Sequence, residues 1–120
     1  MTREWKFFIQ DIYDAMQYIK EFVGTMKQKE FLADEKTRSA VTFKIENIGE
    51  ASKNIPAIVK TKYKDLPWAD MARIRDKITH GYFGIDYKIV WSVVKKDLPA
   101  IEPAVAKILS DLKTSEKKKR

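Results

Sequence analysis

The sequence contains no cysteine and only one histidine, His80. The absence of cysteine excludes disulfides, a thiolate nucleophile and a zinc site with cysteine ligands. A single histidine also excludes a metal site built from several histidines of one chain, so we expect neither a metal nor a cofactor. No apolar run reaches the roughly 18 residues that a membrane-spanning helix needs. The opening "MTREWKFFIQD" meets acid too early for a signal peptide. These absences predict a soluble cytoplasmic protein that does not contact a membrane.

The chain of 120 residues has the size of one domain, and 44% hydrophobic and 12% aromatic residues favour a packed globule. Its net charge of +7 is concentrated in the tail 113–120, where five basic residues and one acidic residue give +4 and leave +3 for the rest. We therefore expect a single helical domain over 1–112, followed by a basic, disordered tail over 113–120. Charge alone does not make the folded part a strong nucleic-acid binder.

Apolar residues recur at three- and four-residue steps in every long segment, which predicts helices. The first helix is expected to end at Gly24, and the second to start at an N-cap on Asp34 and end near Ile55. A short helical turn should follow over 56–63. The small residues near Gly49 would let another helix approach closely.

Two further helices are expected in the second half of the chain. One starts with Asp65 near its N-cap and Pro67 in its first turn, and leads to His80. The next is capped by Asp86, and "DLPAIEP" at 97–103 predicts a boundary or kink before the last helix. No alternating strand of useful length is present. The prediction is an all-α fold, an antiparallel bundle of four to five helices with short loops.

The stretch "RIRDKITHGYFGID", residues 73–86, combines groups suited to chemistry. On a straight helix Asp76 and His80 would lie within about 40° of each other, whereas Arg75 and His80 would diverge by about 140°. Arg75 and His80 can therefore converge only if the helix bends or ends there, and Gly81 and Gly84 favour such an ending.

These side chains would suffice for metal-independent RNA cleavage, whereas from chemistry alone a lone histidine at a helix end is more often structural. The ribose 2′-OH is an internal nucleophile, histidine can remove its proton near neutral pH, and arginine can stabilise the charge on the phosphoryl group. Asp76 can orient the imidazole of His80. A second proton donor must serve the leaving 5′-oxygen. Because the chain has one histidine, acid and base can both be histidines only if two chains share the site.

The string Arg75-Asp76-Lys77-Ile78-Thr79-His80-Gly81-Tyr82 resembles the arginine, four residues, histidine, any residue, tyrosine motif of the HEPN superfamily, in particular its HepT-like toxin branch. The segments "FLADEKTRSAV", "IENIGEASKNIP" and "LPWADMARIRDKITHGYFGIDYKIVWSVVKKDLP" are similar to the same family. The resemblance covers nearly the whole chain apart from the tail.

The resemblance implies a HEPN-like helical bundle that pairs as a homodimer and brings two motifs together in a cleft. It implies a ribonuclease toxin of a toxin–antitoxin system, partnered with a minimal nucleotidyltransferase antitoxin. Arg75 and His80 would be catalytic, and Asp76 would orient His80. Tyr82 would be the site to which the antitoxin transfers AMP.

Two other functions fit the same sequence. The chain can be a non-catalytic helical module that binds a nucleotidyltransferase or a nucleotide, for which Tyr82 matters and His80 does not. It can also be a helical structural protein whose basic tail does the binding. Arg73 and Lys77 flank the motif and are candidates for guiding RNA phosphates.

Four further side chains have simpler interpretations. Glu46 and Glu50 are one helical turn apart in the sequence, and we interpret them as a solvated or salt-bridging face. Glu50 is also a candidate for a supporting residue in the cleft. Trp68 and Trp91 are read as core or interface anchors rather than as stacking platforms for bases.

Overall fold

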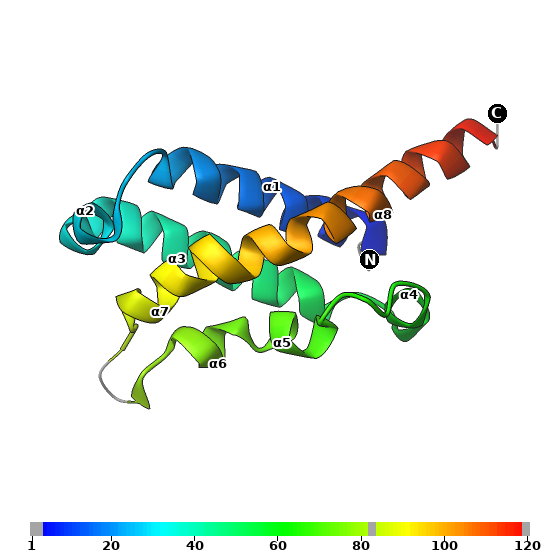
Figure 1. The fold of residues 1–120 in the computed structure, drawn as a ribbon. Helices are drawn as coiled ribbons and strands as arrows, with labels where there is room; N and C mark the ends of the chain where they lie inside the picture. The colour runs from blue at the N-terminus through cyan, green and yellow to red at the C-terminus, as the bar shows by residue number, and fades with distance from the viewer. Residues whose placement is uncertain (1–3, 82–83, 119–120) are drawn as a thin grey trace.

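The fold is all-α, as the sequence predicted. The computed structural model describes residues 4–81 and 84–118, and within these ranges it contains helices and one isolated β-bridge but no named strand. The long helices α1 (Trp5–Val23) and α3 (Glu35–Lys53) lie side by side and antiparallel (Figure 1). The short helix α2 (Gln28–Ala33) connects them.

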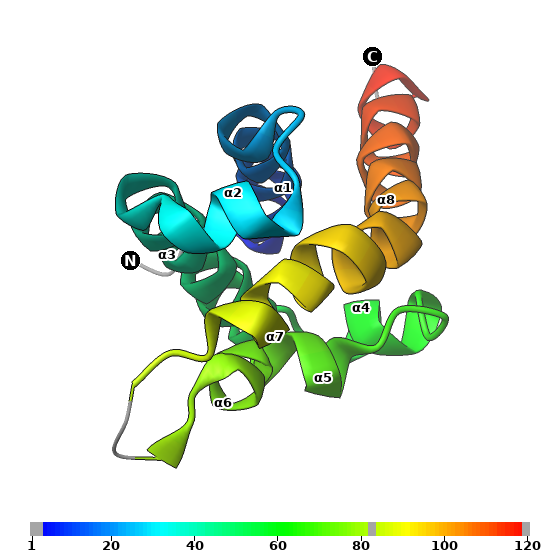
Figure 2. The same ribbon diagram turned by 60° about the vertical axis from the view of Figure 1, so that its left-hand side comes forward.

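The remaining helices pack around this pair. After the short α4 (Ala57–Lys62), helices α5 (Trp68–Ala72) and α6 (Ile74–Ile78) lie against α3. A continuous run of helix follows, made of α7 (Tyr87–Ser92), a π-helical turn (Val93–Asp97) and α8 (Leu98–Lys118). Figure 2 shows this run passing over α5 and α6 before α8 turns away and packs on α1.

Branched aliphatic side chains from all the long helices form the core. Among the described residues, the apolar ones with no exposed surface are Ile9, Ile12, Phe31, Val41, Ile45, Ile48, Ile78, Val90, Val93, Val105 and Ile108. The apolar stripe predicted for the first helix is confirmed. The predicted close approach at Gly49 is also confirmed, because a Cβ placed there would lie 3.1 Å from the Cγ2 atom of Ile74 on α6.

Three predicted helix ends are confirmed. Asp34 caps α3, where its carboxylate accepts the backbone N–H of Thr37 at 2.9 Å, and this hydrogen bond holds the pKa of Asp34 below its usual value. Gly24 follows α1 with a φ of 54°, a conformation that favours glycine. Asp86 caps α7 through the N–H groups of Lys88 and Ile89.

The prediction that Asp65 lies near the N-cap of the helix leading to His80 was wrong. Helix α5 starts at Trp68 after Pro67, and no side chain caps it. Leu66 lies between Asp65 and Pro67 and is buried in the core, so the chain enters the helix through an apolar contact and not through a carboxylate cap. The helix predicted to lead to His80 is also divided, because Arg73 (φ −103°, ψ 18°) separates α5 from α6.

The segment 97–103 was predicted to hold a boundary or a kink. The helical run continues through it, but it changes from the π-helical turn to α8 at Leu98 and then turns away from α7 (Figure 2). The N–H of Leu98 donates to the carbonyl of Val93 five residues back, which is the π-helical pattern. An uninterrupted α-helix would press the Pro99 ring against the carbonyl of Lys95, and the wider turn accommodates it. Helix α8 continues through Lys118, and the hydroxyl of Thr114 donates to the Ser110 carbonyl at 3.1 Å. The disorder expected over 113–120 stays a prediction.

No helix of the described segments combines the length and the apolar composition needed to cross a bilayer.

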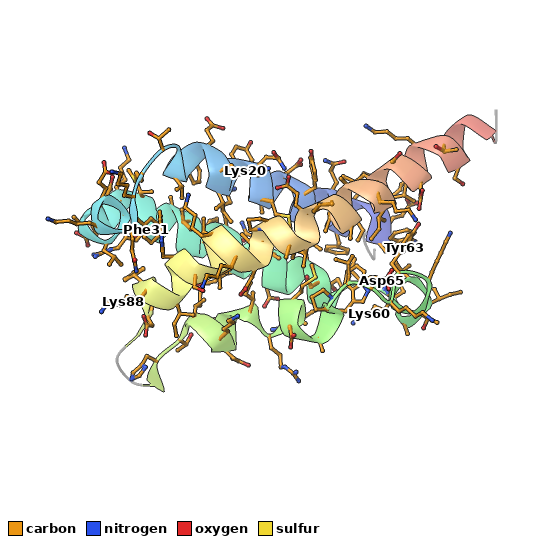
Figure 3. All side chains as sticks on the ribbon, in the orientation of Figure 1. Lys20, Phe31, Lys60, Tyr63, Asp65 and Lys88 are labelled. Atoms are coloured by element: carbon orange, nitrogen blue, oxygen red, sulfur yellow. The ribbon has the colours of Figure 1, made fainter. Side chains whose placement is uncertain are left out.

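Tyr63 connects the segment after α4 to α8. Its hydroxyl donates to the Asp111 carboxylate at 2.9 Å, and its carbonyl accepts the indole N–H of Trp68 at 3.0 Å. Figure 3 shows Tyr63 beside the outer half of α8. Burial and, second, the hydrogen bond to Asp111 raise the pKa of Tyr63, because both disfavour the phenolate.

Replacing Tyr63 by phenylalanine is expected to lower the free energy of unfolding by about 1 kcal/mol at neutral pH. A folded-state pKa above the unfolded value means that this stabilisation is complete below about pH 10 and is lost as the pH rises through the folded-state pKa. Urea unfolding of both proteins near pH 7 and at about pH 11 measures the difference. The same change at Tyr18, whose ring is about half exposed, should cost less than about 0.5 kcal/mol. A stability gap for Tyr63→Phe that does not shrink in alkali would contradict the role of the phenol.

Candidate active site

The motif arginine lies on α6, which the core holds in place. Ile74 and Ile78 are buried on the inner side of this short helix, whereas Arg75, Asp76 and Lys77 are exposed to solvent. Two buried isoleucines one turn apart fix the rotation of α6 against the rest of the bundle. The three charged side chains of the motif are consequently presented outward from a rigid support.

His80 lies two residues beyond the end of α6. The helix ends at Ile78, and Thr79 is extended with φ −91° and ψ 138°. The helix break that Arg75 and His80 need in order to converge is therefore present. It comes earlier than the glycines suggested, since Gly81 and Gly84 lie in the following loop with φ values of 51° and 86°.

The loop that carries His80 is closed at its base. The backbone N–H of His80 donates to the Gly84 carbonyl at 2.6 Å, and the N–H of Asp86 donates to the Ile78 carbonyl at 2.8 Å. These two bonds flank an antiparallel bridge between Thr79 and Ile85. His80 is exposed, so its ring is presented to solvent from a short closed loop and not from a helix face.

The predicted helical alignment of Asp76 with His80 was wrong. Because Thr79 leaves the helical conformation, Asp76 and His80 do not occupy positions one turn apart on the same helix. Asp76 instead lines a groove of about 630 Å³ between α5–α6 and the start of α8. Its proposed part in orienting the imidazole stays a prediction.

Arg73 and Lys77 line the same groove and are paired with carboxylates. Lys77 lies 2.5 Å from Asp97 in the π-helical turn, and Arg73 lies 4.0 Å from Asp70. The floor of the groove is apolar and includes Met71. The pair formed by Lys77 connects α6 to the π-helical turn, whereas the longer contact of Arg73 lies within the α5–α6 segment. The part of both residues in guiding RNA stays a prediction.

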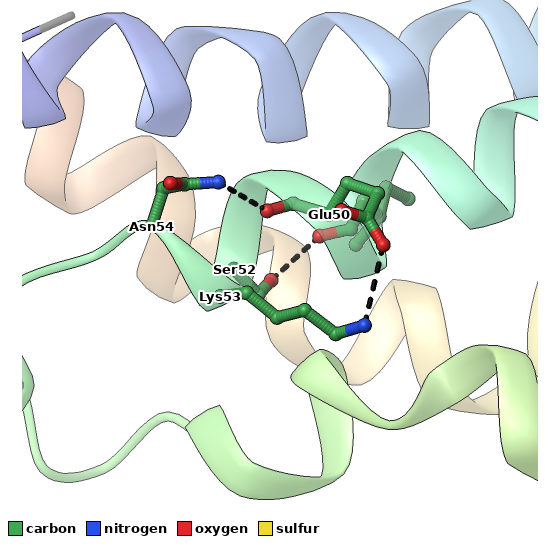
Figure 4. Close-up of polar contacts among 5 residues, drawn as sticks. Glu50, Ser52, Lys53 and Asn54 are labelled. Atoms are coloured by element: carbon green, nitrogen blue, oxygen red, sulfur yellow. Dashed lines mark hydrogen bonds and ion pairs between the residues drawn. The ribbon is translucent and has the colours of Figure 1, made fainter. Parts of the chain in front are cut away.

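Glu50 lies in another part of the molecule. It pairs with Lys53 at 3.2 Å on the outer surface of α3, and its backbone carbonyl accepts the side-chain N–H of Asn54 (Figure 4). It lines a hollow between α1 and α3 together with Lys44. The salt-bridging interpretation of Glu50 is confirmed, and Glu50 is not among the residues around the motif loop.

Trp68 and Trp91 are anchors, as predicted. Trp68 is buried and its indole N–H is bonded to Tyr63. The ring of Trp91 packs 5.2 Å from that of Phe31, and Figure 3 places Phe31 near the end of the bundle that holds α2.

Tyr82, the predicted acceptor of AMP, lies outside the described residues. In the described part of the chain, no three His, Asp or Glu side chains gather closely enough to hold a metal ion.

The sequence analysis did not identify Thr79 as a residue that bonds to the backbone of Arg75. Its backbone N–H and its hydroxyl both donate to the Arg75 carbonyl, at 3.1 Å and 2.7 Å. The residue next to His80 is thus bonded directly to the backbone of Arg75. A threonine four residues after the arginine carries the signal for this contact, since its hydroxyl can reach the carbonyl of residue i−4.

The all-α bundle agrees with the HEPN-like fold that the sequence resemblance implied. Residues 12–108 match the family described as Ribonuclease HepT-like, and the chain belongs to that family.

Known relatives share the family along almost the whole chain. A "Probable ribonuclease HepT" of Thermococcus cleftensis is 43% identical over 108 residues, which cover 90% of this chain and 98% of the relative. A "Putative RNase" of Methanocaldococcus jannaschii is 43% identical over 88% of this chain and 87% of its own length. A "Putative RNase" of Caldanaerobacter subterraneus is 33% identical over 85% and 91%. Comparison with solved structures gives no significant match.

Proposed function

We propose that the protein is a metal-independent endoribonuclease that works as a homodimer in the cytoplasm. The observation that carries the proposal is the end of α6 at Ile78, which leaves Arg75 on the helix and His80 in the closed loop beyond it, both exposed. The family and the printed names of the relatives support RNA as the substrate.

The chemistry uses the 2′-OH of the RNA. His80 of one chain removes the 2′-OH proton, the 2′-oxygen forms a bond to phosphorus, and the bond from phosphorus to the 5′-oxygen breaks. His80 of the partner subunit gives its proton to the leaving 5′-oxygen, so the products are a 2′,3′-cyclic phosphate and a 5′-hydroxyl. Arg75 stabilises the negative charge that develops on the non-bridging oxygens.

The same proposal assigns the protein a biological setting. It is the toxin component of a toxin–antitoxin system, and a minimal nucleotidyltransferase antitoxin silences it by transferring AMP to Tyr82. An adenylyl group two residues from His80 would add a phosphodiester charge and a nucleoside beside the site. That addition would block RNA by repulsion and by bulk.

Purified protein is expected to cleave RNA in the presence of excess EDTA and to leave 2′,3′-cyclic phosphate ends. Gel analysis of end-labelled RNA makes the measurement, with phosphatase treatment before and after acid opens the cyclic ends, because a phosphomonoesterase does not remove a 2′,3′-cyclic phosphate. Cleavage that requires a divalent cation, or products with plain 3′-hydroxyls, would contradict this mechanism. AMP adducts at Tyr82 in a protein that cleaves no RNA and does not slow growth would instead favour a binding module.

A further inference from the structure

Besides the bond between His80 and Gly84, the contacts that close the loop between α6 and α7 involve Asp86 and Thr79, and neither of these two residues has a part in the proposed chemistry. We propose that Asp86 and Thr79 are positioning residues that hold His80 relative to Arg75. The inference rests on the proposed function for its kinetic consequence. Its structural part, the closure of the loop around His80, can be measured without any RNA.

Asp86 bonds to both sides of the loop. Its N–H donates to the Ile78 carbonyl at 2.8 Å, so it is attached to the last residue of α6. Its carboxylate accepts the N–H groups of Lys88 at 3.0 Å and Ile89 at 3.3 Å, so it also forms the first turn of α7. Because one residue makes both attachments, loss of the cap would loosen the base of the loop as well as the start of α7.

Thr79 supplies the second attachment. Its N–H and hydroxyl both bond to the Arg75 carbonyl, and its backbone pairs with Ile85 in the bridge. An extended residue at a helix end has several alternative conformations in the absence of such bonds. The hydroxyl therefore selects the conformation in which the chain turns toward Gly84 and presents His80. A shift of about 1 Å in a catalytic group can lower a rate about a hundredfold, so small changes here have kinetic consequences.

The experiment compares two caps of the same chemistry in the full chain. Asp86→Ala removes the cap next to the motif loop, Asp86→Asn keeps it, and Asp34→Ala removes the cap of α3, where the carboxylate accepts the Thr37 N–H. The pair Thr79→Val and Thr79→Ser removes or keeps the hydroxyl while retaining a side chain of similar size. All variants are checked for cooperative unfolding before use.

The first readout is hydrogen exchange at the His80 amide, which donates to Gly84. Exchange should be faster by about tenfold in Asp86→Ala and Thr79→Val. It should be unchanged within about twofold in the Asn, Ser and Asp34→Ala proteins. The second readout is RNA cleavage, for which kcat should fall by roughly 10- to 100-fold in the same two variants while KM changes by less than about threefold.

The outcomes separate the inference from the proposed function. Unchanged exchange at His80 in both Asp86→Ala and Thr79→Val overturns the inference, and so does equal acceleration by Asp34→Ala, which would indicate a global loss of stability. If wild-type protein cleaves RNA no faster than His80→Ala, the proposed function fails, and the exchange data still decide whether the loop is held by these residues. Faster exchange with unchanged kcat would show that the closure does not serve catalysis and would overturn the positioning role.

Discussion

Replacing His80 by alanine is expected to lower the rate constant for RNA cleavage by about 10²- to 10⁴-fold, because the proton acceptor for the 2′-OH is removed. His80 is exposed and lies outside the core, so the melting temperature should change by less than about 2 °C. Single-turnover cleavage with excess enzyme measures the chemical step directly. A loss smaller than about fivefold would remove His80 from the mechanism.

Mixing wild-type and His80→Ala chains tests whether two chains share a site. In a fully exchanged 1:1 mixture, a shared site that needs both histidines should give about one quarter of the rate of the same total amount of wild-type chain. Independent sites should give about one half. The catalytic form should also run at twice the 14.0 kDa chain mass on sedimentation.

The two arginines at the motif provide a matched control. Arg75→Ala should lower kcat, since the charge that stabilises the phosphoryl oxygens is lost, and Arg75→Lys should restore only part of the rate because lysine lacks the bidentate fork. Arg73→Ala removes the same side chain two residues earlier. It should weaken RNA binding and its salt dependence without a comparable effect on kcat.

Replacing Ile78 by alanine is expected to lower the free energy of unfolding by about 2–5 kcal/mol. Ile78 has no exposed surface, ends α6, and accepts the Asp86 N–H through its carbonyl. The substitution leaves a cavity directly behind the motif, so kcat should fall as well. Urea unfolding followed by circular dichroism, and cleavage assays well below the unfolding midpoint, make the two measurements.

The matched surface change is Ile58→Ala. Ile58 is 79% exposed on α4, so the same loss of atoms should change stability by less than about 0.5 kcal/mol and leave cleavage unaltered. An Ile78→Ala protein as stable as Ile58→Ala would mean that α6 is not anchored by this side chain.

Much of the fold could be predicted because its signals are local. A cap such as Asp34 or Asp86 acts on backbone groups two or three residues away, and an apolar stripe is visible in the spacing alone. The break at Arg73 was missed because neither glycine nor proline marks it.

The sequence indicated the candidate residues but not the geometry of the segment that carries them. It named Arg75 and His80 as candidates and required a helix break between them, which is present. It placed the break at the glycines, whereas α6 ends at Ile78. The earlier end depends on the bridge between Thr79 and Ile85, a pairing that forms only after the loop has turned back on itself. Non-local backbone pairing of this kind leaves no periodic signal in the sequence.

The π-helical turn sets the rotational phase of the long helical run. Val93 and Val105 are twelve residues apart, and on an uninterrupted α-helix their side chains would diverge by about 120°. A π turn absorbs one additional residue, which reduces the divergence to roughly 20° and allows both valines to be fully buried. Deleting one residue from 93–97 would rotate the buried face of α8 out of the core. The length of this segment is therefore more tightly constrained than the identity of its exposed lysines.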